Sequence, residues 1–335
     1  MKAVIHDRYG PPEVLRLAEY PKPTPMRDEV LVRVHAATVN RTDCATLRAK
    51  PWFMRLATGL LRPKRAILGS DFSGTVESVG PETTTLKVGD AVFGLDDGGL
   101  CSHAEYLTIS ESDAVATMPA NCSFEHATAC LEGAHYALNF INKVDLKEGD
   151  EVLVNGATGA IGSAMVQLLR SLGAKVTAVC GTKNVELVKS LGADIVLDYQ
   201  REDFTKSGGR YSFVFDAVGK SSFGACRRLL EPKGVYISSE LGKMSQNPFL
   251  GLVTPLFGGR TVGFPLPLNR RRSVLLVRKL IEERKFVAVV DRTLPVEEIV
   301  EAFRYVETGE KVGNVVITMA RASGDADDAL TSPTG

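Results

Sequence analysis

The chain has 335 residues, which is long for one hydrophobic core and sufficient for two domains. Lysine and arginine number 40, as do aspartate and glutamate, so no net charge attracts nucleic acid or an anionic membrane, and neither is expected as a partner. No stretch reaches the roughly 18 apolar residues of a transmembrane helix, and the opening residues MKAVIHDRYG lack the apolar core of a signal peptide.

The first part of the chain has the pattern of β-strands. Residues 29–39 (EVLVRVHAATV), 73–80 (SGTVESVG) and 91–95 (AVFGL) alternate or run apolar, and they end in turn residues. From about residue 124 the pattern becomes helical, beginning with FEHATACLEGAHYALNFI.

From residue 151 onward, strands alternate with helices through short loops. Strands are predicted at 151–155, 175–180, 194–199, 213–219 and 234–239, and helices near 160–172, 184–191 and 222–230. This alternation predicts a doubly wound parallel sheet. After about residue 267 a helix, a short strand, a second helix and a last strand at 314–318 are too few to form a domain, so we expect them to pack on the first part.

The predicted fold class is therefore α/β, with a doubly wound domain at 121–267 inserted between two pieces of a β-rich domain, 1–120 and 268–320. The last residues, 321–335 (RASGDADDALTSPTG), are small, polar and acidic, and a disordered tail is predicted there. Six cysteines without paired spacing favour free thiols in a reducing compartment, so a cytoplasmic location is expected.

A glycine-rich stretch, VNGATGAIGSAMVQ, occupies residues 154–167, between the first predicted strand of the parallel sheet and its helix. Three glycines alone are weak evidence and fit a structural turn, but within a strand–turn–helix–strand unit they indicate a dinucleotide site. The helix N-terminus then offers free N–H groups to a pyrophosphate. The predicted cradle consists of Ala157, Thr158, Gly159, Ala160, Ile161 and Gly162.

The residues after the second strand favour NADPH over NADH. An NAD site places Asp or Glu there, against the ribose 2′-hydroxyl. This chain has Gly181, Thr182, Lys183 and Asn184, which leave room for a 2′-phosphate and offer it hydrogen bonds and a positive charge. Tyr199, after the third strand, is expected beside the same phosphate. The alternative for Lys183 is an ordinary exposed lysine.

Several longer stretches resemble the medium-chain dehydrogenase/reductase superfamily over about residues 1–318. They include VLVRVHAATVNRTD, ILGSDFSGTVESVGPETTTLKVGDAVFG, EVLVNGATGAIGSAMVQLLRSLGAKVTAVCGTKN, LVKSLGADIVLDYQREDF, FDAVGK and KVGNVVI. The likeness is to the zinc-free quinone oxidoreductase branch, the zeta-crystallin-like and reticulon-interacting-protein-like reductases. It implies a GroES-like catalytic domain around a Rossmann NADP-binding domain.

The resemblance also allows the zinc question to be examined by position. Where zinc relatives have Cys-His this chain has Asn40-Arg41, and where they have Gly-His-Glu it has Gly69-Ser70-Asp71. Catalytic zinc needs three ligands of the His, Cys or carboxylate type. No metal is therefore expected. A different set, built on Cys101 and His103, is the alternative, although scattered Cys and His are usually packing residues.

A zinc-free site suits conjugate reduction. A quinone or an α,β-unsaturated carbonyl delocalises the charge that hydride brings, so modest hydrogen-bond donors suffice where a plain ketone would need a metal. The predicted function is an NADPH-dependent oxidoreductase acting on quinones or enones. The alternatives are an alcohol or ketone dehydrogenase of a biosynthetic pathway and a non-catalytic NADPH-binding protein.

The resemblance suggests catalytic candidates. Asn40 stands at the position of the zinc thiolate, where it donates to substrate or ribose or else ties down a turn. Asp43 is more simply a residue that fixes this loop. Thr128 and His135 flank ACLEG, which runs beside the nicotinamide in relatives. His135 and Tyr136 are candidate proton donors, with a structural role as the alternative.

Residues 46–66 form a longer segment than in simple quinone reductases. Its apolar residues predict a lid over a bulky substrate, with a loop packed on the domain edge as the alternative. The lid candidates are Trp52, Phe53, Met54 and Leu60, with Leu56 and Leu61 beside them.

Further cofactor contacts are implied by the resemblance alone. They follow later strands of the sheet or lie near the C-terminus: Ala217, Val218, Gly219, Ser238, Gly263, Phe264, Pro265, Gly313 and Asn314. The run TVGFPL (261–266) is where family dimers pair strand to strand, so a homodimer is expected.

Overall fold

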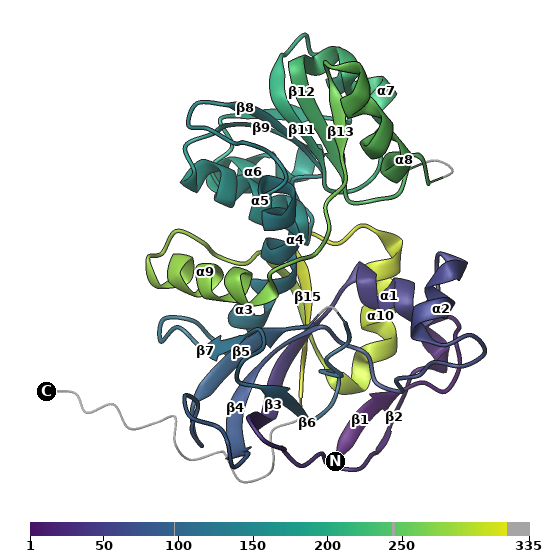
Figure 1. The fold of residues 1–335 in the computed structure, drawn as a ribbon, viewed down its shortest axis with the longest axis vertical. Helices are drawn as coiled ribbons and strands as arrows, with labels where there is room; N and C mark the ends of the chain where they lie inside the picture. Colours follow the sequence, from purple (N-terminus) through teal and green to yellow (C-terminus); the bar gives the residue numbers. More distant parts are fainter. Residues whose placement is uncertain (97, 243–244, 320–335) are drawn as a thin grey trace, which may run out of the picture. The chain divides into compact units, whose positions relative to one another are not determined.

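The computed structural model describes residues 1–96, 98–242 and 245–319 (Figure 1). They form two compact units. The first unit comprises Met1–Met118, Arg292–Glu310 and the residues from Val315 onward, and the second comprises Pro119–Asp291 and Lys311–Asn314. None of the helices within the described ranges is long and apolar enough to cross a membrane.

The first unit is built on a mixed-length antiparallel sheet. Its central strand, β3 (Glu29–Val39), pairs with β4 (Asp71–Val79), β6 (Tyr106–Ser110) and β15 (Asn314–Thr318). The sheet order is β14-β15-β3-β4-β5-β7, and the remaining strands are β5 (Ala91–Leu95), β7 (Val115–Thr117) and β14 (Val290–Pro295). The long apolar run at 29–39 thus forms the centre of the sheet because both of its faces are largely buried.

Short helices and a two-stranded ribbon complete this unit. The ribbon pairs β1 (Lys2–Ile5) with β2 (Arg16–Glu19), and the helical elements are η1 (Pro12–Val14), α1 (Arg41–Arg48), η2 (Trp52–Met54), α2 (Arg55–Thr58), η8 (Val296–Glu298) and α10 (Ile299–Thr308). The core contains Leu47 of α1, Phe72 of β4 and Phe303 of α10, all fully buried. Such large apolar side chains supply most of the burial that stabilises a domain of this size.

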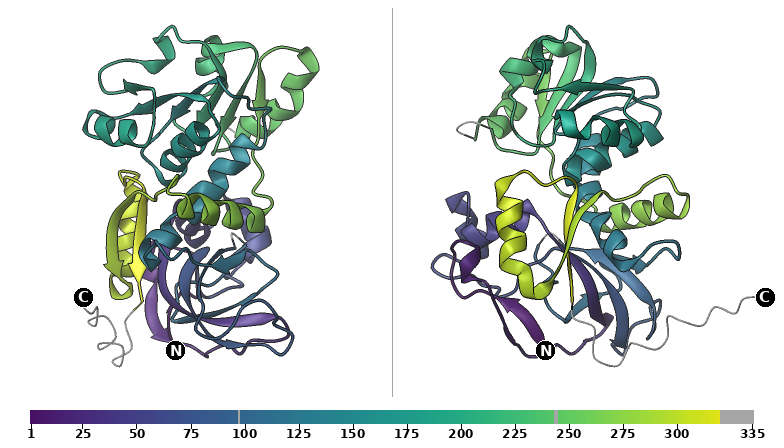
Figure 2. Two further views of the ribbon diagram at one scale, coloured as in Figure 1. Left: turned by 90° about the vertical axis from the view of Figure 1, so that its left-hand side faces the viewer. Right: turned by 180° about the vertical axis from the view of Figure 1, so that it is seen from behind.

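The second unit contains a six-stranded parallel sheet with helices on both faces (Figure 2). The order is β10-β9-β8-β11-β12-β13, and the strands are β8 (Glu151–Asn155), β9 (Lys175–Cys180), β10 (Ile195–Asp198), β11 (Tyr211–Asp216), β12 (Leu230–Ser238) and β13 (Thr261–Gly263). The order reverses between β8 and β11, which is the topological switch point at which such sheets bind ligands. The predicted α/β fold class is confirmed.

Most helical elements of this unit connect the parallel strands, whereas α3 (Phe124–Ala129) and α4 (Leu131–Ile141) precede the first of them and α9 (Arg270–Glu282) follows the last. The connecting elements include α5 (Ala160–Ser171), η3 (Thr182–Asn184), α6 (Val185–Ser190), η4 (Phe204–Lys206), α7 (Phe223–Cys226), η5 (Arg227–Leu229), α8 (Gln246–Val253) and η7 (Thr254–Phe257). The helix predicted near 222–230 is shorter than expected, because β12 already begins at Leu230.

The unit boundaries differ from the predicted domains in the segment 268–291 and in Lys311–Asn314, which also groups with the second unit. The sequence analysis placed residues 268–291 with the first domain, but they group with the second unit. The reason is that α9 packs on α4, where Ser273 Oγ lies 2.9 Å from His135 Nδ1, and that Asn121 Nδ2 donates to the Ile281 carbonyl at 3.0 Å. The predicted disordered tail at 321–335 lies outside the described residues.

Candidate functional site

The glycine loop of the second unit follows β8 and leads into α5. Gly156 has φ +80°, and a Cβ on Gly162 would lie 2.1 Å from the Gly156 carbonyl oxygen and 2.8 Å from Ala157 Cα. Only glycine fits these two positions without moving backbone. At Gly159, by contrast, a Cβ would meet only the Gly156 oxygen, at 3.8 Å. The protein itself does not fill the space in front of Gly159, so a ligand can approach the backbone there.

The start of α5 has the character of an anion site. Gly159 is the N-cap residue, and no side chain accepts a hydrogen bond from the first turn. The N–H groups of Ala160, Ile161 and Gly162 therefore have no side-chain cap. Twelve residues of helix stand behind them, and the aligned peptide dipoles favour a negative group at this end.

The C-terminal segment at Gly313 closes one side of the glycine loop. Gly313 N donates to the Thr158 carbonyl at 2.6 Å, and Gly159 and Gly313 form an isolated parallel bridge. Gly313 has φ +73°, and a Cβ there would lie 2.1 Å from the Val289 carbonyl oxygen. The buried Asn314 is held by two hydrogen bonds to the same carbonyl, from its backbone N at 2.8 Å and from Nδ2 at 3.0 Å.

The loop after β9 is the predicted 2′-phosphate site. Tyr199 is 60% exposed, and its hydroxyl would lie 3.2 Å from a Cβ on Gly181, so the two residues are neighbours and a side chain at position 181 would crowd the tyrosine. Lys183 is exposed, and Asn184 ends η3. Thr182 behaves differently from the prediction. Its hydroxyl donates to Asp198 and its backbone N donates to Gln200 Oε1 at 3.1 Å, so neither group is available as a phosphate donor.

Asp198 explains why Thr182 is turned inward. Its carboxylate is buried at the end of β10 and accepts from Thr182 Oγ1 through one oxygen and from Gln200 N, at 2.9 Å, through the other. The sequence analysis missed this residue because it searched for an acid only at the end of the second strand. The acid lies on the third strand and joins the two loops instead of facing a ribose.

Asp216, at the end of β11, is the second functional residue that the sequence analysis missed. It is fully buried, and its two oxygens accept from five donors. These are Asn155 Nδ2 at 3.0 Å, Val218 N at 3.3 Å, Gly219 N at 2.9 Å, Ser221 N at 2.9 Å and Tyr236 Oη at 3.0 Å. The carboxylate therefore shapes the loop that contains the predicted contacts Ala217, Val218 and Gly219. The motif FDAVG was the signal that pointed to it.

The remaining predicted cofactor residues of the parallel sheet end at the same edge. Ser238 ends β12 and accepts from Glu240 N at 3.3 Å. Gly263 ends β13, and a Cβ there would lie 2.9 Å from Ile237 Cγ1. Phe264 and Pro265 follow directly and are half-buried. Because the carboxyl ends of parallel strands meet at one edge, these residues share an edge with the glycine loop.

His135 does not have the surroundings expected of a proton donor. It is fully buried in α4, with Nδ1 2.9 Å from Ser273 Oγ and Nε2 3.3 Å from Asn139 Nδ2. Both ring nitrogens therefore have partners inside the second unit, which favours the structural alternative. Tyr136 is half-buried, with its ring 5.7 Å from the His135 ring, and Thr128 is fully buried in α3.

In the first unit, Asn40 caps α1 and is tied to β3 and β4. It forms a capping box with Asp43, and its Nδ2 donates to Thr38 Oγ1 at 2.5 Å. Thr38 in turn donates to both oxygens of the buried Asp71, from N at 2.8 Å and from Oγ1 at 2.6 Å. The carboxylate at the position of the family's zinc-site glutamate thus organises a hydrogen-bonded turn.

Asp43 completes the same cluster. Its Oδ2 accepts from Asn40 N at 2.9 Å and its Oδ1 from Gly69 N at 3.1 Å. Burial raises the pKa of Asp43 to about 7, because desolvation outweighs the two backbone hydrogen bonds that favour the charged form. These contacts give Asp43 the loop-fixing role that the sequence analysis preferred for it.

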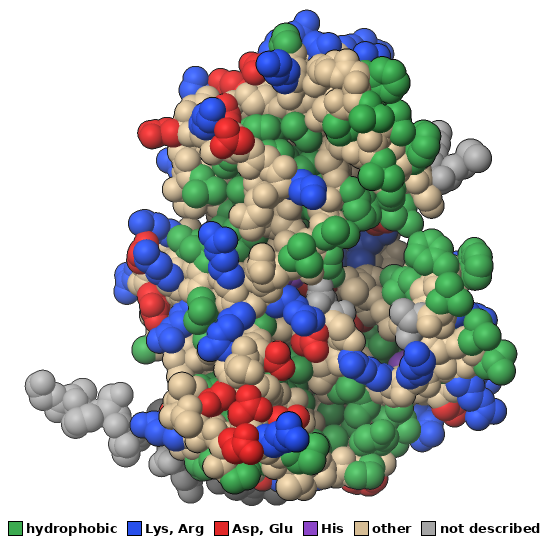
Figure 3. Space-filling view, in the orientation of Figure 1, with side chains coloured by type: hydrophobic (Ala, Val, Ile, Leu, Met, Phe, Trp, Pro, Cys, Tyr) green, Lys and Arg blue, Asp and Glu red, His purple; other side chains and the backbone are tan. Residues whose placement is uncertain are grey.

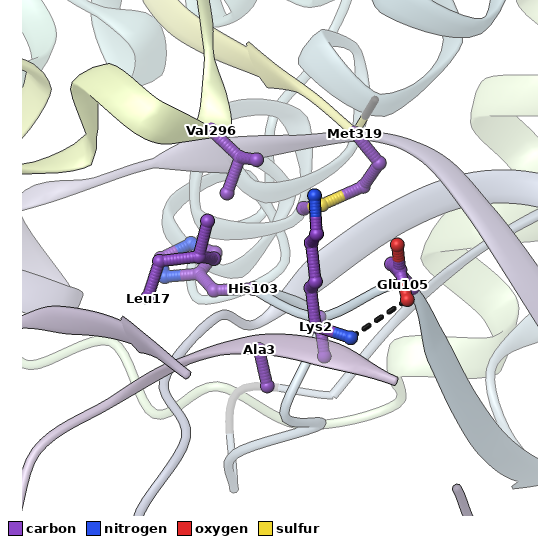
Figure 4. A pocket seen from close by; sticks show the side chains of 8 residues that line it. Lys2, Ala3, Leu17, His103, Glu105, Val296 and Met319 are labelled. Carbon is purple, nitrogen blue, oxygen red and sulfur yellow. Dashed lines mark hydrogen bonds between the residues drawn. The ribbon is translucent and has the colours of Figure 1, made fainter. Parts of the chain in front are cut away.

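His103 lies beside this cluster and borders a narrow crevice (Figure 4). Its Nε2 is 2.9 Å from the Thr38 carbonyl oxygen, and burial lowers its pKa. The crevice has no room for a water molecule, so it is no substrate pocket. Its walls are formed by Lys2, Ala3, Leu17, His103, Ala104, Glu105, Val296 and Met319. Within the described residues no group of three or more His, Cys, Asp and Glu side chains is arranged to hold a metal ion.

The predicted lid segment forms η2 and α2 of the first unit. Trp52 is 73% exposed and Leu61 86% exposed, and Phe53, Leu56 and Leu60 are also exposed, whereas Met54 is half-buried. Apolar side chains accordingly gather on the surface over α2 (Figure 3). The end of the segment is anchored by Tyr9, whose hydroxyl lies 2.7 Å from Thr58 Oγ1 and donates to the Gly59 carbonyl at 2.8 Å.

Comparisons with known proteins agree with this arrangement. The family model described as an alcohol dehydrogenase GroES-like domain matches residues 26–136, and the one described as a zinc-binding dehydrogenase matches residues 191–317. A 2-methylene-furan-3-one reductase from Solanum lycopersicum is 31% identical over 330 residues, which cover 95% of this chain and 79% of the relative.

Two further relatives extend the comparison. A chloroplastic NADPH-dependent alkenal/one oxidoreductase from Arabidopsis thaliana is 30% identical over 329 residues, covering 95% of this chain and 79% of the relative. The solved structure of a quinone oxidoreductase from Coxiella burnetii superposes with a TM-score of 0.84 at 27% identity, covering 96% of this chain and 99% of the other.

A GroES-like unit, a Rossmann unit and a glycine loop at its switch point define the dehydrogenase/reductase class of fold. The chain belongs to the medium-chain dehydrogenase/reductase superfamily, in the branch that holds quinone and enone oxidoreductases, as the sequence resemblance predicted.

Proposed function

We propose that this protein is an NADPH-dependent oxidoreductase that transfers hydride to a quinone or an α,β-unsaturated carbonyl without the help of a metal ion. The observation that carries the proposal is the open edge of the parallel sheet. There an uncapped helix N-terminus stands behind Gly159, and the loop after β9 has no carboxylate facing the ligand side. Relatives named as enone, alkenal and quinone reductases support the same reading.

The residues at this edge fit NADPH. The N–H groups at the start of α5 would hold its pyrophosphate, and the space in front of Gly159 admits the phosphate oxygens. Lys183 and the exposed Tyr199 would contact a 2′-phosphate, and Gly181 avoids a side chain that would crowd Tyr199. The backbone at Gly263, Phe264 and Pro265 would hold the carboxamide. When bound, the coenzyme supplies the hydride.

The first unit contributes a fixed turn instead of a metal centre. Asn40, Arg41 and Ser70 occupy positions where zinc relatives have ligands, and Asp71 is held by Thr38. A conjugated acceptor spreads the incoming charge over several atoms, so hydrogen-bond donors are sufficient to stabilise it. Tyr136 is the proposed donor of the second unit, and Asn40, whose Nδ2 donates to Thr38 Oγ1, supports the turn of the first unit. Asp43 holds the backbone of Asn40 in place.

The exposed apolar segment at 52–61 is the proposed substrate lid. Its side chains are available to cover a bulky apolar acceptor, and Tyr9 anchors the segment through Arg55, Thr58 and Gly59. Trp52→Ala should raise KM for a polycyclic quinone while leaving KM for a small enone unchanged. Equal effects on both acceptors would contradict the lid.

We also propose a homodimer that forms at β13. This three-residue strand is the edge of the parallel sheet, and exposed apolar side chains surround it, namely Phe249, Leu252, Leu256 and Phe257. Apolar surface is visible over α8 in Figure 3. Light scattering should give twice the chain mass, and Leu252→Asp should give a monomer. Leu61→Asp, an equally exposed position on the first unit, is the matched control.

The cytoplasm, or another reducing compartment, is the proposed location. All six cysteines are free, and four of them are buried. Buried free thiols without disulfide partners are typical of proteins from reducing surroundings. Extracellular secretion of the native protein would contradict this proposal.

The decisive experiment is the oxidation of NADPH and of NADH in parallel, with a chelator present, against 9,10-phenanthrenequinone and a panel of enones. Turnover that prefers NADPH and is unaffected by the chelator is expected. Oxidation of simple alcohols with NADP⁺ would favour a dehydrogenase of a biosynthetic pathway instead. Tight NADPH binding without turnover on any acceptor would favour a non-catalytic protein.

A further inference from the structure

A basic groove lies on the second unit, away from the proposed coenzyme edge. It is lined by segments that each precede a strand: η4 (Phe204–Lys206) precedes β11, η5 (Arg227–Leu229) precedes β12, and Arg260 precedes β13. All strands of this sheet are parallel, so their amino ends share one edge and their carboxyl ends the other. The groove is therefore at the edge opposite the glycine loop.

The charge of this groove is strongly one-sided, although the chain as a whole carries no net charge. Lys206, Arg227, Arg228 and Arg260 line it, and Asp203 is the one carboxylate among its lining residues. That carboxylate is already engaged by Thr205 N at 3.0 Å, by Thr205 Oγ1 at 2.7 Å and by Lys206 Nζ at 3.4 Å. Lys and Arg side chains gather at this end of the unit in Figure 3.

Backbone carbonyls, and not carboxylates, hold the arginines in place. Arg228 Nε donates to the Thr205 carbonyl at 2.8 Å, and Arg260 Nε donates to the Leu230 carbonyl at 2.7 Å. Arg210 adds a further cation by donating to the Arg228 carbonyl at 2.8 Å. The Arg227 side chain forms no hydrogen bond or ion pair with any of the described residues, and its backbone N–H donates to the Phe223 carbonyl.

This arrangement holds several guanidinium groups together without neutralising them. Their mutual repulsion is unfavourable, and an anion placed among them would offset it with charge-assisted hydrogen bonds. Arg260 is anchored through Nε, and Arg228 through Nε and, at 3.4 Å, through Nη2 to Thr205 Oγ1, so other terminal nitrogens of the two side chains are left to form such bonds. Arginine suits this task since its planar fork matches the oxygens of a phosphate group.

The dimensions of the groove favour an organic phosphate over a bare ion. Its volume is ≈ 540 Å³, which is in the range of small-molecule sites. Gly224 and Ala225 form part of the lining, and a Cβ on Gly224 would meet nothing within 4 Å, so the groove is open beside the arginines. An extended nucleic acid would need a longer basic stripe, which these clustered cations do not form.

We propose that this groove is a second ligand site, which binds a small phosphorylated metabolite through Arg227, Arg228, Arg260 and Lys206, independently of the coenzyme. The site belongs to the chain whatever reaction the opposite edge performs. It would let a phosphorylated compound bind while coenzyme is bound.

Calorimetric titration with the coenzyme edge saturated by NADP⁺ tests this proposal. The probes are fructose 1,6-bisphosphate, as an organic phosphate without adenine, and inorganic phosphate. Saturable binding of the sugar bisphosphate is expected, with weaker binding of inorganic phosphate. The double variant Arg227→Gln/Arg260→Gln should weaken the first by about tenfold or more, because it removes two charge-assisted hydrogen bonds to the phosphate oxygens.

The matched control removes the same charge elsewhere on the unit. Lys189→Gln/Arg278→Gln alters the exposed Lys189 of α6 and the half-buried Arg278 of α9, and it should change the affinity by less than about twofold. An equal loss in both double variants would show attraction to net charge alone and would overturn the proposal. So would equal affinities for the two probes, or no saturable binding of either. Because heat is measured and not turnover, these outcomes are independent of the oxidoreductase assay.

Discussion

The two candidate regions of this protein differ in how their polar groups are satisfied. Around Asn40 in the first unit, amide, hydroxyl and carboxylate groups bind one another through Thr38, Asp71 and Asp43. At the sheet edge of the second unit, the first turn of α5 has no side-chain cap. Buried polar groups must be paired, so a set left unpaired at an open edge indicates a ligand, whereas a closed set indicates support.

The largest expected effect on stability and coenzyme binding comes from a residue that is buried and also shapes the open sheet edge. Asp216 is closed to solvent yet shapes the loop at the open edge. Asp216→Asn replaces an acceptor oxygen by an amide that faces N–H and hydroxyl donors, so buried donors lose their partner. We expect a loss of about 3 kcal/mol or more in the free energy of unfolding, together with weaker NADPH binding.

Urea unfolding and fluorescence titration with NADPH measure the two effects of Asp216→Asn. Tyr236→Phe is the matched control, because it removes one of the five donors and leaves the carboxylate with four. It should cost about 1 kcal/mol and change coenzyme affinity little. If both variants have the same stability, the carboxylate does not organise the loop.

Two glycines of the same loop allow a supporting position, Gly162, to be compared with a ligand-facing position, Gly159. Gly162→Ala would place a methyl group 2.1 Å from the Gly156 carbonyl oxygen, so the backbone must move, and a loss of about 2–4 kcal/mol in stability is expected. Gly159→Ala meets nothing closer than 3.8 Å and should leave stability within about 0.5 kcal/mol. Its methyl group would instead occupy the ligand's space, so NADPH affinity should fall while the fold is retained.

If Gly159→Ala binds NADPH as tightly as the parent protein, the assignment of Gly159 as a ligand-facing position is wrong. In that case the space before Gly159 would not be the pyrophosphate site. Thermal unfolding and NADPH titration on the same samples distinguish this result from simple misfolding of either variant.

Asp43 tests the closed cluster by its pH dependence. Its pKa is raised to about 7 in the folded protein, above its value near 4 in an unfolded chain. The folded state therefore binds this proton more tightly, and the stability it contributes is present at low pH and is lost as pH rises through about 7. A rise from near 4 to about 7 corresponds to a loss on the order of 4 kcal/mol between about pH 4 and pH 7.

Asp43→Asn removes this titration. Urea unfolding of both proteins at several values from about pH 5 to pH 8 gives the difference in their free energies of unfolding. The parent protein should lose stability relative to the variant as pH rises. A difference that stays constant, or that changes in the opposite direction, would show that Asp43 is already ionised at the lowest pH.

The sequence predicted features that depend on local pattern and failed where tertiary contacts decide. The parallel strands and the glycine loop follow from periodicity and from glycine spacing, and both are present. The segment 268–291 was assigned to the wrong unit, because the residues of α9 and α4 do not by themselves indicate that the two helices pack on each other. Asp216 and Asp198 were missed because their roles depend on donors from several strands that only the fold brings together.

The smallest expected effect separates two neighbours in one loop. Lys183 is exposed and has no carboxylate in front of it, so Lys183→Gln should reduce the preference for NADPH over NADH by about five- to tenfold, through KM rather than kcat. Thr182 donates its hydroxyl inward to Asp198, so Thr182→Val should change that preference by less than about twofold and lower stability instead. Judged by residue type alone, both Lys183 and Thr182 would be expected to donate hydrogen bonds to the 2′-phosphate. Steady-state kinetics with both coenzymes decide between these cases: a loss of preference in Thr182→Val equal to that in Lys183→Gln would mean that the hydroxyl leaves Asp198 when coenzyme binds.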